Sequence, residues 1–132
     1  MLTPTEATFV ASFVEPNFRE RYLFMLGSRR RSKMLSRLYH HFDFKAERIE
    51  KLKIKSGEEQ VVWKTLQVKS GAATCQVIST SPELDGRVLT LPEFISAGSR
   101  WHDASIYIFD PQRVVLFHDE YDAYLLESQS SR

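Results

Sequence analysis

Hydrophobic periodicity divides this 132-residue chain near Ser56 and Gly57, and the division limits the folds open to it. Before that point, apolar residues recur at spacings of three and four, which is typical of amphipathic helices. After it, Val, Ile, Thr and aromatic residues cluster in short runs between turn residues, which is typical of strands. This order predicts the α+β class, with N-terminal helices packed on one face of a small antiparallel sheet ending in a β-hairpin.

Start and stop signals place the predicted helices. Thr3, Pro4 and Glu6 have the spacing of a capped helix start, and Gly27 is a plausible helix stop. The predicted helices cover residues 4–14, 17–26 and 28–42, and a short helix begins near residues 90–93. Residues 45–55 predict a charged surface helix or an irregular connection.

Five strands are predicted in the second half, over residues 61–69, 74–80, 87–90, 105–109 and 113–117. Asp110 and Pro111 favour a tight turn, so the last two strands should form the antiparallel hairpin. We expect one α+β domain over residues 1–127 and a flexible tail over residues 128–132.

Composition excludes several classes of protein. The chain is 42% hydrophobic and 27% charged, which excludes collagen-like and highly charged disordered sequences. Its longest apolar run, residues 22–26, is far shorter than the roughly 20 residues that cross a bilayer. The N-terminus has no signal-peptide pattern. The single cysteine, Cys75, lies among apolar residues and is expected to be a small buried hydrophobic residue. We therefore expect a cytoplasmic protein with no membrane partner.

Charge is distributed unevenly along the chain. The net charge of the whole is +1, but residues 19–55 alone hold twelve Lys and Arg against four acids. The segments before and after them are acidic. An asymmetry of this kind bears on partners more than on the fold.

The third predicted helix concentrates the positive charge on one face. At about 100° per residue, one arc of about 120° collects its basic side chains, with apolar residues opposite. These basic side chains are Arg29, Arg30, Lys33, Arg37, His40 and His41. Three consecutive arginines at the start of a helix oppose its dipole. Either the second and third helices are continuous through Gly27, or an anionic group offsets the repulsion.

We interpret the chain as a binding module that acts without catalysis and needs no cofactor or metal. The basic face over residues 29–41 would engage an anionic partner, either nucleic acid or an acidic protein surface, unless it is merely a solvated face. Trp101, between Arg100 and His102, is a candidate anchor for a partner. An exposed edge strand would also allow a homodimer.

Two other functions stay open. The acidic C-terminal end around Tyr121 and Tyr124 would suit a protein inhibitor, an immunity protein or an antitoxin that docks on a basic partner. A metal-independent nuclease would need two histidines and a cation, for which His40, His118 and Arg37 are available. Nothing in the spacing makes these three converge, and no catalytic residue is assigned.

Overall fold

The computed structural model describes residues 2–41, 43–45, 49–52, 58–97, 104–118 and 123–128. Its helices are α1 (Pro4–Phe13), the 3-10 turn η1 (Pro16–Phe18), α2 (Arg19–Leu26), α3 (Arg31–His41), α4 (Glu59–Ser70) and α5 (Leu91–Ala97). Its strands are β1 (Ile49–Leu52), β2 (Cys75–Ser79), β3 (Val88–Leu89), β4 (Ser105–Asp110), β5 (Val114–His118) and β6 (Ala123–Glu127). The predicted α+β class is confirmed.

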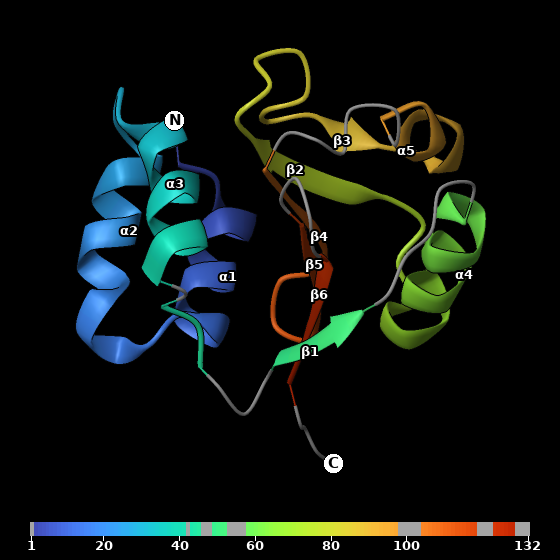
Figure 1. The fold of residues 1–132 in the computed structure, drawn as a ribbon, viewed down its shortest axis with the longest axis horizontal. Coiled ribbons are helices and arrows are strands. Elements are labelled where there is room, and N and C mark those ends of the chain that lie inside the picture. Colours follow the sequence, from blue (N-terminus) through green and yellow to red (C-terminus); the bar gives the residue numbers. More distant parts are fainter. Residues whose placement is uncertain are drawn as a thin grey trace.

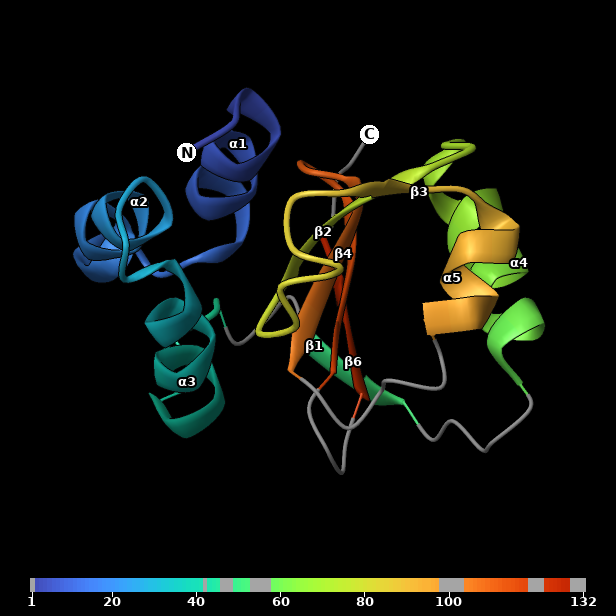
Figure 2. The same cartoon turned by 90° about the horizontal axis from the view of Figure 1, so that it is seen from above.

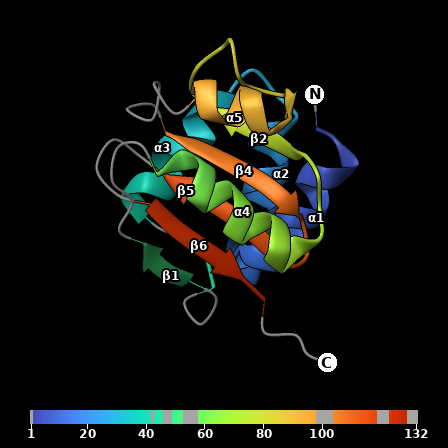
Figure 3. The same cartoon turned by 90° about the vertical axis from the view of Figure 1, so that its right-hand side faces the viewer.

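The strands form one sheet in the order β1-β6-β5-β4-β2-β3, and every neighbouring pair is antiparallel. The predicted hairpin joins β4 and β5, and its turn is held by the Gln112 amide, which donates to Asp110 Oδ1 at 3.0 Å. Figure 3, seen from the side of α4 and α5, shows β6 beside β1 with α4 in front of the sheet.

Helices cover both faces of the sheet. Seen edge-on in Figure 1, the sheet separates α1, α2 and α3 from α4 and α5, and Figure 2 shows the same two layers from above. The N-terminal helices lie on one face as predicted. The second helical layer was not predicted, because half of it lies in a segment that the sequence pattern assigned to a strand.

Side-chain alternation along the strands builds two separate cores. In β5, Val115 and Phe117 join the cluster under α1, α2 and α3, whereas Val114 and Leu116 join the cluster under α4 and α5. Successive strand residues point to opposite faces, so a strand covered on both sides is apolar throughout. All five residues of β5 are accordingly buried.

The strand predicted over residues 61–69 is wrong, because this segment forms α4. Its buried residues are Val62, Trp63 and Leu66, whose spacing fits one face of a helix and not one side of a strand. The helix ends at Gly71, whose φ of 74° lies in the left-handed region and whose amide donates to Gln67 O at 2.7 Å. Burial of one helical face outweighs the β-propensity of valine here.

Two strands lie where none was predicted. Residues 45–55 contain β1, and the C-terminal segment contains β6, which pairs with β1 on one side and β5 on the other. Beyond β6, the Ser128 amide donates to Arg113 O at 3.0 Å. Within the described part of the chain, no helix has the length and apolarity to cross a membrane.

Candidate functional site

The turn between α2 and α3 separates two distinct helices. The Gly27 amide donates to Leu23 O at 3.1 Å and ends α2. The Ser28 hydroxyl then accepts from the Arg30 amide at 3.1 Å, just before α3 begins at Arg31. A continuous helix through Gly27 is thereby excluded.

Arg31 meets two carboxylates. Its Nη1 donates to Glu6 Oε1 at 3.0 Å, its Nη2 donates to Glu6 Oε2, and its Nε donates to Asp85 Oδ2 at 2.7 Å. Glu6 is fully buried. The hydrogen bonds from Arg31 to Glu6 are the largest cause that holds the pKa of Arg31 above its ordinary value. Carboxylates therefore offset the charge of Arg31, the arginine at the start of α3, whereas Arg29 and Arg30 are exposed on the turn before it.

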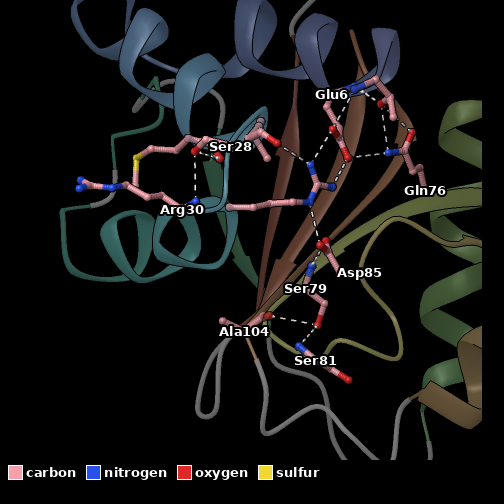
Figure 4. Close-up of polar contacts among 12 residues, drawn as sticks. Glu6, Ser28, Arg30, Gln76, Ser79, Ser81, Asp85 and Ala104 are labelled. Carbon is pink, nitrogen blue, oxygen red and sulfur yellow. Dashed lines mark hydrogen bonds and ion pairs between the residues drawn. The ribbon is translucent and has the colours of Figure 1, made fainter. Parts of the chain in front are cut away.

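The two carboxylates that pair with Arg31 also accept hydrogen bonds from residues of β2 (Figure 4). Gln76 Nε2 on β2 donates to Glu6 Oε2 at 2.8 Å, and the Ser79 amide donates to Asp85 Oδ1 at 3.1 Å. Arg31 thus ties α3 to α1 and to the β2 side of the sheet, and we call Glu6, Arg31, Gln76 and Asp85 the ionic network. It turns one face of α3 inward and fixes which side chains point outward.

The apolar face of α3 supports the same orientation. Met34, Leu35 and Leu38 are fully buried in the cluster beneath α1, α2 and α3, as the helical pattern predicted. Arg30, next to Arg31 in sequence, instead extends away from Glu6 and Asp85 in Figure 4. The two adjacent arginines therefore point in opposite directions, Arg31 toward the carboxylates and Arg30 away from them.

A groove of about 710 Å³ lies between the outer faces of α2 and α3. It is lined by Arg21, Phe24, Met25, Arg30, Lys33, Ser36, Arg37, His40 and His41, which we call the basic groove. No carboxylate is among the described residues that line it. The groove brings together most of the basic face that the sequence predicted, and adds side chains from α2.

Arg37 anchors the α3 wall of the groove. Its Nε lies 3.0 Å from Asp43 Oδ2, as an ion pair that is not aligned as a hydrogen bond, and its guanidinium lies 5.3 Å from the Phe18 ring centroid. The Tyr22 hydroxyl donates to the same Asp43 oxygen at 2.6 Å. Burial and this hydrogen bond raise the pKa of Tyr22 above its ordinary value, so the phenol keeps the proton that it donates.

Three other cations of the groove, unlike Arg37, have no ion-pair partner among the described residues. Arg21, Arg30 and Lys33 are exposed, and none of the described residues forms an ion pair with their side chains. Like charges held close together without a counterion attract anions from solution. The basic groove is therefore a surface that attracts anions.

Arg21 and Phe24 were not predicted as site residues. Phe24 is 66% exposed, and on a helical wheel it lies about 180° from the buried pair Tyr22 and Leu26. An aromatic residue on the polar face of an amphipathic helix was the available signal. The spacing of apolar residues identifies the buried face of a helix and not its polar face, on which both residues lie.

The other predicted binding residues do not join the groove. Arg29 is exposed on the turn before α3 but does not line it. Trp101 and Tyr121 lie outside the described residues. Tyr124 was expected on an exposed docking surface, but it belongs to β6, is half-buried, and stacks on Phe117 with ring centroids 6.1 Å apart. Pairing of β6 within the sheet is the reason for this difference.

The histidines proposed for a nuclease lie on opposite sides of the sheet. His40 is on α3, whereas His118 is buried on β5. The ring centroid of His118 lies 5.4 Å from that of Tyr107, which belongs to the cluster under α4 and α5. His118 Nε2 lies 3.4 Å from the Tyr107 hydroxyl. These two histidines cannot act on one substrate atom in this fold.

Cys75 is buried, and burial raises the pKa of its thiol to about 12, so it is a protonated core residue. No group of three or more His, Cys, Asp or Glu among the described residues is arranged to hold a metal ion. Comparisons with models of protein families, with curated proteins and with solved structures found no match.

Proposed function

We propose that this protein is a small binding module whose basic groove holds an anionic partner, and that the partner is nucleic acid. The observation that carries the proposal is the convergence of six basic side chains, from two helices, on one groove without a carboxylate among its lining residues. The cytoplasmic location expected from the single cysteine belongs to the same proposal.

The arrangement of the cations favours a phosphate backbone over an acidic protein surface. Lys33 and Arg37 lie four residues apart on α3, and Arg30 precedes Lys33 by three residues on the turn before the helix, so the three form a row with about one helical turn between members. A nucleic-acid strand presents charge at similarly regular intervals. Arginine forks also match phosphate oxygens in a bidentate manner.

The structure behind the row supports the same function. The ionic network and the buried residues of α3 hold the helix in one orientation, so its outward cations need little ordering when a ligand binds. A solvated basic face with no ligand would not require this convergence with α2. In the described part of the C-terminal end, residues 123–128, Glu127 pairs with Lys69 at 3.4 Å.

The test is a binding titration with labelled single- and double-stranded RNA and DNA. Wild type is compared with Arg30→Glu/Lys33→Glu, which reverses two exposed charges of the groove. The matched control is Lys64→Glu/Lys69→Glu on α4, on the other side of the sheet, with the same change in net charge.

We expect wild type and the α4 control to bind at low salt, and the groove variant to lose binding by at least about tenfold, because two phosphate contacts are replaced by repulsion. Equal loss in both variants would mean that only net charge matters. No binding of any nucleic acid by wild type at low salt would refute the proposal, and tight binding of an acidic polypeptide instead would assign the groove to a protein partner.

A further inference from the structure

We infer that the basic groove selects single-stranded nucleic acid and stacks one of its bases on Phe24. This inference rests on the proposed function and adds the strand state of the ligand and the residue that reads it. Phe24 is 66% exposed, and it is the one aromatic side chain among the large hydrophobic residues that the structure describes as exposed.

The position of Phe24 within the groove suits a stacking role. It lies on the α2 wall beside Arg21, whereas Lys33, Arg37 and the histidines come from α3. A strand that lies along the groove can therefore set its phosphates against α3 and a base against α2. Grooves that hold single strands combine cations for the backbone with aromatic rings for the bases in this way.

A double-stranded ligand cannot stack a base on Phe24. Bases in a double helix are stacked on one another, so their faces are closed to a side chain at the surface. An acidic polypeptide satisfies the cations but has no flat ring to cover Phe24. The single strand is the ligand that uses both chemical components of the groove.

The length of the α3 wall is adequate for a short strand. Lys33 and His41 are eight residues apart on α3, which corresponds to about 12 Å along the helix at about 1.5 Å per residue. At a phosphate spacing of about 3.4 Å, as along one strand of a duplex, this wall spans about four nucleotides. Several phosphates can therefore be contacted while one base reaches Phe24.

The test uses oligo(U) and oligo(dT), a duplex, polyglutamate and an abasic strand of equal length that keeps every phosphate. We expect wild type to bind both single strands at least about fivefold more tightly than the abasic strand or the duplex. Phe24→Ala should remove that preference and leave the affinity for the abasic strand unchanged, whereas Phe24→Trp should retain it. Val68→Ala, a substitution at an exposed apolar residue of α4, is the control and should change neither affinity.

Phe24 is exposed, so its variants should fold, and urea midpoints equal to wild type will verify this. The comparison of abasic and base-bearing strands on wild type needs no variant. Equal affinity for the two strands, or polyglutamate bound as tightly as oligo(U), would overturn the inference. If wild type bound the two strands equally and Arg30→Glu/Lys33→Glu lost binding to both, the proposed function would stand while the stacking role failed. Loss of all nucleic-acid binding by wild type would remove both.

Discussion

The two helical layers of this protein are attached to the sheet by different chemistry. The layer of α1, α2 and α3 combines an apolar cluster with the ionic network, whose central carboxylate, Glu6, is fully buried. The layer of α4 and α5 is held by packing of rings, with Trp63 and Phe94 centroids 5.1 Å apart and Trp63 and Phe109 centroids 5.0 Å apart. Lys69 of α4 and Glu127 of β6 form an ion pair between this layer and the sheet, and both side chains are exposed.

This difference teaches where orientation is specified. Apolar packing is largely non-directional, so it secures a layer without fixing every rotation of its helices. A partly buried arginine that must meet two carboxylates at once, one of them fully buried, has very few acceptable positions. The layer with this constraint also carries the basic groove. We conclude that the ionic network fixes the orientation of α3.

The largest expected effect comes from breaking the network on one side. Arg31→Met leaves the carboxylate of Glu6 buried without its charged partner, and should lower the free energy of unfolding by about 3–5 kcal/mol in urea titrations. The neighbouring Arg30→Met removes an exposed charge and should change it by less than about 0.5 kcal/mol. Similar values for the two variants would contradict the role assigned to the network.

A second substitution should repair part of that loss. In Glu6→Gln/Arg31→Met no fully buried charge remains in the ionic network, and the amide oxygen can still accept from Thr3 N, as Glu6 Oε1 does at 3.0 Å. We expect the double variant to be more stable than Arg31→Met by about 1–3 kcal/mol. Strictly additive losses in this double-mutant cycle would show that the cost of Arg31→Met is lost packing.

Alkaline pH tests the apolar layer. Burial raises the pKa of Cys75 from 9.0 to about 12, so above pH 9 the unfolded chain releases the thiol proton while the folded chain keeps it. Stability from this group is complete below pH 9 and falls by about 1.4 kcal/mol per pH unit above it. Tyr22 acts in the same direction, so the measurement is the difference in slope between wild type and Cys75→Ala. Parallel curves of stability against pH for the two proteins would contradict this role of Cys75.

The smallest effect is expected at the exposed pair of the α4 layer. Lys69→Met removes the contact with Glu127 and should cost less than about 1 kcal/mol, because water screens both groups. Thermal unfolding of this variant beside Arg31→Met gives the contrast directly. A loss as large as that of Arg31→Met would show that polar contacts anchor both layers.

Local signals predicted much of the fold. Thr3 and Glu6 form the capping box that their spacing indicated, with the Glu6 amide donating to the Thr3 hydroxyl at 3.1 Å. The apolar face of α3 and the hairpin after Asp110 are also where the sequence placed them. Each of these features depends on residues a few positions apart, so a single sequence contains the information.

Features that depend on distant residues were not predicted. Glu6 reads as a helix cap, and nothing near it shows that Arg31, 25 residues away, completes its contacts. Likewise β6 became a strand through pairing with β1 and β5, and α4 through burial of one face against the sheet. The α3 side of the groove was visible as a helical periodicity, whereas its closure by Arg21 and Phe24 depends on how α2 packs beside α3.

The most direct test of the basic groove is the slope of log affinity against log salt for oligo(U). Each phosphate contact with a single strand contributes about 0.7 to the magnitude of this slope. We predict that Lys33→Gln, at an exposed position of the groove, reduces it by about 0.7, whereas Lys64→Gln on α4 leaves it unchanged. An unchanged slope in Lys33→Gln, or an equal reduction in both variants, would contradict the assignment of phosphate contacts to this groove.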